Sequence, residues 1–375
     1  MSDLMKVKIG RIASSAAFWM VIVVVYLQNR GLTLTQIYQM LSVYYLAVVV
    51  LEFPTGVIGD YFSHRISVMI GQFIIGVAFI ALALNGGFFY YLAVLLFAAL
   101  GIALASGSDT ALLHSLSKDF KHDQSQIRIF TTLVAVIATT VGSIIASFSF
   151  AIPFILTGIF NLIAAFLLLS VKDRNHVKNE GNIFNTAFRA LKYVKGNKKL
   201  MSLMIISGIV GAFSFSIKWF YNPLLQMVNV PLLFWGILIS IAMLVPLVGV
   251  KIFQKKKSAH LLLALIIFII SIIPIGIAGL AMVPIVFLYF NSAIRGYLET
   301  YLDVEMNNEI ETNERASILS LNNLLIRFGA SIYTPFAGYI LDKYSLSAVT
   351  IGTSTLLLLL VIYPSSVLIR KRILV

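Results

Sequence analysis

The sequence predicts an all-α integral membrane protein with twelve transmembrane helices in two six-helix pseudo-symmetric bundles. Of its 375 residues, 59% are hydrophobic and only 11% are charged, which excludes a water-soluble fold. Continuous apolar stretches of about 20 residues, the length that crosses a bilayer core as a helix, recur along the chain. Strands of a membrane barrel would instead be short segments of alternating polarity.

Each expected span is one continuous apolar run between polar connections. The basic start of the chain precedes the first run without a clear cleavage site, so this run is expected to stay in the protein. The spans are predicted at 12–29, 36–58, 66–84, 88–112, 128–149, 151–171, 200–222, 232–252, 259–279, 282–304, 316–338 and 346–369.

The basic residues predict the orientation. The termini and the alternate connections hold 23 of the 28 Lys and Arg residues. Since positive charge is retained in the cytoplasm, we expect both termini there and a multi-pass protein of the cell membrane. The net charge of +13 then follows from topology and requires no nucleic-acid partner.

A polar segment near the midpoint predicts the domain boundary. We expect an N-terminal bundle at 1–171, a cytoplasmic basic linker at 172–199 and a C-terminal bundle at 200–375. The linker carries eight Lys and Arg residues, and its apolar residues fall on one face of an amphipathic interfacial helix. It is either a plain connector or a surface that senses lipid or docks a partner.

An internal repeat supports this division. At an offset of 187 residues, Arg128 aligns with Arg315 and Gly142 with Gly329, in the fifth span of each half. Paired halves of this kind are expected of transporters built from structural repeats.

Residues 52–65 read EFPTGVIGDYFSHR and lie in the predicted loop between spans two and three. They resemble the loop signature Gly-x-Leu-Ala-Asp-Arg-x-Gly-Arg-Lys of the major facilitator superfamily, above all its bacterial efflux-type members. Gly56 and Asp60 fit the signature directly. The departures are Tyr61 for the first Arg, Ser63 for Gly, and the pair 64–65, His-Arg, for Arg-Lys.

The resemblance implies a conformational latch made of Gly56, Asp60, His64, Arg65 and Asp109. In that family a basic residue of the loop forms an ion pair with an acidic residue near the end of span four. The matching acidic residue here is Asp109. An ionised carboxylate at the hydrocarbon edge is costly unless paired, so Arg65 or His64 is the expected partner. Solvated loop charges are the alternative.

Span five contains a stretch of small residues that includes Gly142, Ser143 and Ala146. It resembles a weakened form of the Gly-rich motif of the family's antiporters, with Ser143 in place of Pro. Small residues let helices approach closely, as a rocking interface requires. Ordinary helix packing explains the pattern equally well.

Ionisable residues within spans are candidates for proton or substrate binding, because burying charge in a membrane is costly. Arg327 lies near the middle of span eleven and could meet an anionic group or a carboxylate. Glu52 lies about 9 Å inside the end of span two, where it could carry a proton or support the loop. Arg295 and Glu299 lie four residues apart on one helical face and could neutralise each other. Lys218 is expected to snorkel to the outer interface.

Polar and aromatic residues of other spans are weaker candidates for lining a central cavity, because periodicity does not say which face points inward. They are Trp19, Tyr26, Tyr44, Tyr45, Asn161, Tyr289, Asn291, Asn322 and Asn323.

These features predict a secondary active transporter that moves a small solute by alternating access, with proton-coupled efflux of a drug-like compound or metabolite preferred. An ion-coupled nutrient importer and a non-transporting scaffold or sensor are the alternatives. No nucleotide-binding loop or hydrolase motif occurs, and Cys is absent, so we expect no enzyme activity, no metal site and no cofactor. The expected partners are the small-molecule substrate and membrane lipid, with the monomer as functional unit.

Overall fold

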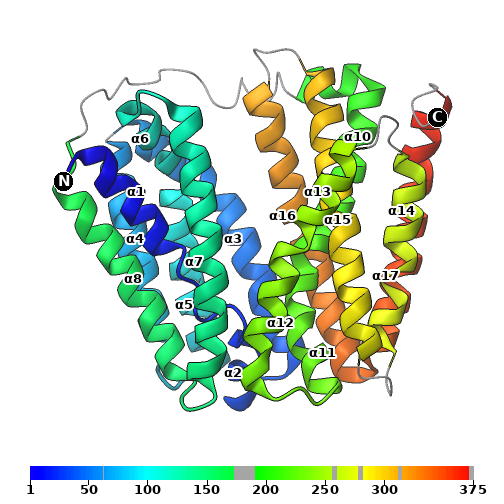
Figure 1. The fold of residues 1–375 in the computed structure, drawn as a ribbon, viewed down its shortest axis with the longest axis horizontal. Helices are drawn as coiled ribbons and strands as arrows, with labels where there is room; N and C mark the ends of the chain where they lie inside the picture. Colours follow the sequence, from blue (N-terminus) through cyan, green and yellow to red (C-terminus); the bar gives the residue numbers. More distant parts are fainter. Residues whose placement is uncertain (62, 173–190, 256–259, 278–281, 311–314, 371–375) are drawn as a thin grey trace. The chain divides into compact units, whose positions relative to one another are not determined.

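The computed structural model describes residues 1–61, 63–172, 191–255, 260–277, 282–310 and 315–370, without the side chains of residues 53, 56–61, 255, 316, 369 and 370. Over these ranges the regular secondary structure is helical, and no strand occurs in them (Figure 1). The predicted amphipathic face of the linker falls mainly in 173–190, outside the described residues.

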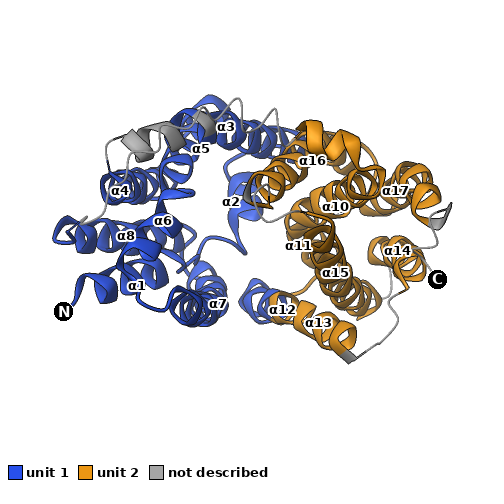
Figure 2. Cartoon of the chain, turned by 90° about the horizontal axis from the view of Figure 1, so that it is seen from above, with its two compact units in different colours: residues 1–180, 231–240 blue, residues 181–230, 241–375 orange. Residues whose placement is uncertain are grey.

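Contacts between helices divide the chain into two units (Figure 2). One unit comprises residues 1–180 with 231–240, and the other comprises residues 181–230 with 241–375. The sequence placed 231–240 in the second half, whereas its contacts group this segment with the first.

The first unit packs its helices around α4, which contacts both α5 and α8. A Cβ atom added at Gly71 would lie 2.6 Å from the Gly101 carbonyl oxygen, and one at Gly158 would lie 2.6 Å from that of Gly76. The glycines therefore let these backbones touch. The helices are α1 (Asp3–Ser14), α2 (Val23–Asn29), α3 (Leu34–Tyr61), α4 (His64–Leu82), α5 (Phe88–Ala105), α6 (Ser108–Leu116), α7 (Phe120–Ala146) and α8 (Ala151–Leu169).

The second unit is organised around α10, which contacts α15, α16 and α17. Its elements are α10 (Lys198–Ile217), the 3-10 turn η1 (Lys218–Phe220), α11 (Tyr221–Met227), α12 (Leu232–Leu244), α13 (Pro246–Lys255), α14 (Leu261–Ile270), the 3-10 turn η2 (Ile273–Gly276), α15 (Met282–Glu309), α16 (Arg315–Lys343) and α17 (Leu346–Arg370). The first residues of α12 belong to the first unit.

Nine helical segments of the described residues are long and apolar enough to cross a membrane. Three predicted spans are not among them. The predicted span 12–29 is not one helix, because α1 ends at Ser14 and α2 begins at Val23. The described residues of the span 259–279 form the short α14 and η2. The span 282–304 lies in the 28-residue helix α15, whose Arg295, Glu299 and Asp303 lower its hydropathy.

The predicted span 88–112 is also interrupted, at the junction of α5 and α6. Gly107 has a φ of 75° there, a left-handed conformation that favours glycine. The break starts a new helix at Ser108 and places Asp109 in its first turn.

The two repeat-related glycines occupy equivalent places within their own units. A Cβ atom at Gly142 of α7 would collide with the backbone of Phe18, between α1 and α2, and one at Gly329 of α16 would lie 2.8 Å from Cβ of Ala212 in α10. In each unit, the fifth segment thus packs closely on the first at its glycine.

Candidate functional site

A polar pocket of about 530 Å³ lies in the second unit, between α10, η1, α15 and α16. Its volume is in the range of small-molecule sites. Its polar lining consists of Ser207, Ser214, Lys218, Arg295, Glu299, Asp303, Asn322, Asn323 and Arg327.

Charges of both signs face this pocket. Arg295 and Arg327 lie near enough to act electrostatically on Lys218, and Arg295 acts in the same way on Glu299. The Lys218 ammonium lies 3.9 Å from the centroid of the Phe215 ring and 5.2 Å from that of Trp219. These cation–π contacts help to offset the cost of burying the charge.

The helix directions separate the charges along the pocket. Asn322 Nδ2 donates to Ser207 Oγ at 2.9 Å, and the hydroxyls of Ser216 and Thr334 lie 3.0 Å apart, so α10 and α16 run parallel. Lys199, near the start of α10, pairs with Glu309 at the end of α15 at 2.7 Å, so these two helices run antiparallel. Lys218 and Arg295 therefore lie toward one end of the pocket, and Asp303 lies toward the other.

Some polar atoms of the pocket have no hydrogen-bond partner among the described residues. Arg295 Nε and Asn322 Oδ1 are buried without a hydrogen bond. In the described part of the chain, no ion pair within 4.0 Å joins Arg295 to Glu299, although Arg295 acts electrostatically on Glu299. Buried polar atoms left unpaired are costly, so a bound solute or water is needed to satisfy them.

The pocket brings together three predicted candidates, Arg295, Glu299 and Arg327, with the weaker candidates Asn322 and Asn323. The expectation that Lys218 snorkels to the outer interface was wrong, since it lines this pocket. Lys218 begins η1, directly after α10, and sequence periodicity does not show which way its side chain points.

Other weak candidates serve packing within their units. The Tyr26 hydroxyl donates to the Leu82 carbonyl at 2.8 Å, Asn161 Nδ2 donates to the Thr157 carbonyl at 2.8 Å, and Asn291 Nδ2 donates to Ser271 Oγ at 2.9 Å. All three side chains are buried.

The remaining proton-carrier candidate, Glu52, lies in the first unit. Its Oε1 accepts a hydrogen bond of 3.0 Å from Oγ of Ser106, the residue that caps the C-terminus of α5. This contact favours a role in supporting the break between α5 and α6. Gly56 and Asp60 lie within α3, and the side chain of Asp60 is outside the described part.

Asp109 pairs with a residue that sequence reasoning did not select. Its Oδ2 lies 2.8 Å from Arg11 Nε of α1. The expected partner Arg65 instead donates to the carbonyls of Leu169 and Val171 at 2.9 and 3.0 Å, at the C-terminal end of α8. The Asp109–Arg65 pairing was therefore wrong for this structure, because the first turn of α6 faces α1. His64 begins α4.

The small residues of α7 make close helix contacts. Ser143 Oγ accepts a hydrogen bond of 2.9 Å from the Gly236 amide and donates to the Leu233 carbonyl at 3.2 Å, both in the α12 residues of the first unit. A Cβ atom at Gly236 would lie 2.7 Å from the Thr139 carbonyl oxygen. Ala146, near the end of α7, is buried.

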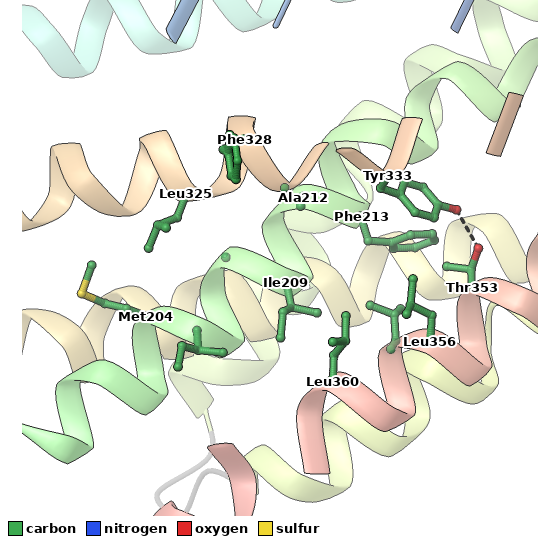
Figure 3. A pocket seen from close by; sticks show the side chains of 14 residues that line it. Met204, Ile209, Ala212, Phe213, Leu325, Phe328, Tyr333, Thr353, Leu356 and Leu360 are labelled. Atoms are coloured by element: carbon green, nitrogen blue, oxygen red, sulfur yellow. Dashed lines mark hydrogen bonds between the residues drawn. The ribbon is translucent and has the colours of Figure 1, made fainter. Parts of the chain in front are cut away.

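A second pocket of the same unit is apolar (Figure 3). About 270 Å³ in volume, it lies between α10, α16 and α17, with Met204, Leu325, Phe328 and Leu360 among its walls. Tyr333 and Thr353 close one side through a hydrogen bond of 2.6 Å. It has no charged lining among the described residues, so it is unsuited to a charged solute.

Among the residues that the structure describes, no group of three or more potential metal ligands gathers.

Comparison with known proteins places these features in a family. The sequence model of the Major Facilitator Superfamily matches residues 9–334, whereas no curated protein matches the chain. The crystal structure of the nucleoside transporter NupG is similar, with a TM-score of 0.80 and 16% identity over 98% of this chain and 99% of that one. So is an inward-facing, occupied bacterial homologue of the human lysosomal transporter Spinster, with a TM-score of 0.77 and 11% identity over 96% and 95%. A POT family transporter bound to a thioalcohol-conjugated peptide has a TM-score of 0.72 and 14% identity over 98% and 96%. At these identities the likeness concerns the fold.

Proposed function

The chain belongs to the Major Facilitator Superfamily, and we propose that it exports a small solute across the cell membrane in exchange for protons. As a member of this family it is a multi-pass membrane transporter rather than an enzyme. The proposal includes the outward direction of solute transport, its coupling to protons and the cytoplasmic location of both termini. The polar pocket is the proposed solute site, and no cofactor beyond the ion gradient takes part.

The observation that carries the proposal is Glu299 at the wall of the pocket, one helical turn from Arg295. An exchanger requires proton and solute to compete for one site, so that each leaves before the other binds. A carboxylate exposed to the pocket provides such a site, because it takes either a proton or a donor group of the solute. The small-residue contacts of α7 support a packed interface of the kind a rocking transporter uses.

Import is the second candidate, and it follows from the same residues with a different solute. If the solute has only a negative group, protonation of Glu299 removes the negative charge beside Arg295, so the solute binds with the proton and both travel together. The basic side chains of the pocket favour this alternative over a passive scaffold, because charges in a membrane segment are costly to keep.

Reconstitution in liposomes with an imposed pH gradient and a panel of compounds tests the proposal. Proton-driven accumulation is expected in the direction opposite to proton flow. Glu299→Gln should abolish the response to the gradient while solute exchange at equal pH continues. Glu305→Gln is the matched control, because Glu305 lies on the same helix but pairs with Lys199 at 3.6 Å outside the pocket. An undiminished gradient response in Glu299→Gln would exclude Glu299 as the coupling group.

A further inference from the structure

We propose that the solute is a zwitterion, with its negative group held at the Lys218–Arg295 end of the polar pocket and its positive group at Glu299, toward Asp303. This inference rests on the proposed function, since it names the solute class of the same site.

The spacing on α15 supports two separate charge sites. Arg295, Glu299 and Asp303 follow one another at intervals of four residues, so they share one face of the helix. At 1.5 Å per residue each interval is about 6 Å along the axis. A solute with charges about 6 Å apart reaches Arg295 and Glu299 together, and a longer one reaches Asp303 at about 12 Å.

The other two helices reinforce this polarity. Lys218 directly follows α10 at the positive end. Ser207 and Asn322 lie at the opposite end and are linked by a hydrogen bond. Arg327 lies five residues beyond Asn322, about 7.5 Å nearer the positive end. Three helices thus contribute to a pocket that is basic at one end and acidic or amide-lined at the other.

The buried atoms without partners match the two groups of a zwitterion. Arg295 Nε is a donor at the basic end, suited to a carboxylate or phosphate oxygen. Asn322 Oδ1 is an acceptor at the other end, suited to an ammonium group.

A solute with a single charge fits less well. A plain anion leaves Glu299 and Asp303 facing it with like charge, and a plain cation meets Lys218, Arg295 and Arg327. Like charges placed together cost binding energy and give specificity against such solutes. A positive group of the solute also competes with the proton for Glu299, and an exchanger requires this competition.

Equilibrium binding to the full-length protein in detergent tests this class independently of transport. The probes are ω-amino carboxylates of graded chain length, with unsubstituted alkanoates and alkylamines of matched length. Binding is followed by the fluorescence of Trp219, beside Lys218, in a chain with Trp19→Phe and Trp235→Phe. Thermal unfolding confirms the affinities and shows that each variant folds.

The amino carboxylates are expected to bind at least about tenfold more tightly than either matched probe, which is the gain from one charge-assisted hydrogen bond. Glu299→Gln should remove this advantage over the alkanoates, Arg295→Gln should remove it over the alkylamines, and Glu305→Gln should retain both.

Equal affinity for amino carboxylates and alkanoates, or no binding by any probe, would overturn the zwitterion class. The first result would leave proton-coupled transport standing. Conversely, preferred binding of the amino carboxylates without gradient-driven transport would retain the solute class and reject the proposed exchange.

Discussion

Arg11 Nε lies 2.8 Å from Asp109 Oδ2, which ties α1 to the first turn of α6. The two side chains are 17% and 26% exposed, so water screens the pair only partly. Asp109 Oδ1 is buried without a hydrogen bond, and Arg11 is therefore the counter-charge that makes this carboxylate tolerable. The resemblance paired Asp109 with a basic residue of the loop between spans two and three, whereas in the structure Asp109 forms its ion pair with the first helix.

This pair predicts a particular pattern in a double-mutant cycle. Arg11→Gln should lower the free energy of unfolding by about 1–3 kcal/mol, because it leaves a partly buried carboxylate without its partner. Adding Asp109→Asn should recover part of the loss, since the uncompensated charge disappears. Thermal unfolding of the two single variants and the double variant measures the coupling.

Transport by Asp109→Asn provides the functional part of this test. Turnover should fall while expression stays near the wild-type level, because an amide keeps the size of the side chain but not its charge. Unchanged turnover would remove Asp109 from the conformational mechanism, and additive unfolding energies would show that the two side chains do not interact.

Apolar run length predicted the helices well because each helix in a membrane must satisfy its own backbone hydrogen bonds. It failed where a helix is interrupted inside an apolar run. The interruption between Ser14 and Val23 and the left-handed Gly107 both occur within predicted spans. A hydropathy average over a window of residues includes such interruptions, so it reports the composition of a segment but not whether the helix continues through it.

The candidate site shows the same limit. Charge within a span sufficed to select Arg295, Glu299 and Arg327, because burial cost makes such residues rare without a role. Lys218 was misjudged because the sequence does not show which way a side chain near the end of a helix points. Arg11 was missed because its partner lies 98 positions away in the chain, and pairing at that range depends on packing.

A second ion pair attaches α1 to α7, and its loss should be detectable by hydrogen exchange. Lys8 Nζ lies 2.5 Å from Asp123 Oδ1, and Ser117 Oγ donates to Asp123 Oδ2 at 2.5 Å. Lys8→Gln should raise hydrogen exchange in α1, because Asp123 loses its cation and α1 its anchor to α7. Lys118→Gln is the control, since Lys118 is exposed and, among the described residues, forms no ion pair or hydrogen bond with α1. Equal exchange in both variants would show that the Lys8 contact does not hold the helix.

The close approach at Gly142 predicts a steric effect. A methyl group there collides with backbone atoms of Phe18, and backbone atoms cannot move aside by a rotamer change. Gly142→Ala should therefore destabilise the protein by about 1–3 kcal/mol in thermal unfolding. Gly352→Ala is the matched control, because a Cβ atom there has nothing within 4 Å and alanine favours a helix over glycine by up to about 1 kcal/mol. Equal stability of the two variants would contradict the packing of α7.

Glu52→Gln separates the two candidate proton carriers. Glu52 Oε1 accepts from Ser106 Oγ at 3.0 Å, and a glutamine oxygen can accept the same bond. If Glu52 supports the break between α5 and α6 and Glu299 carries the proton, Glu52→Gln should keep its response to a pH gradient in liposomes. Glu52→Leu, which removes the acceptor, should lower thermal stability by about 1–3 kcal/mol. A Glu52→Gln protein that exchanges solute but ignores the gradient would move the coupling role from Glu299 to Glu52, because only the loss of its titratable proton distinguishes this variant.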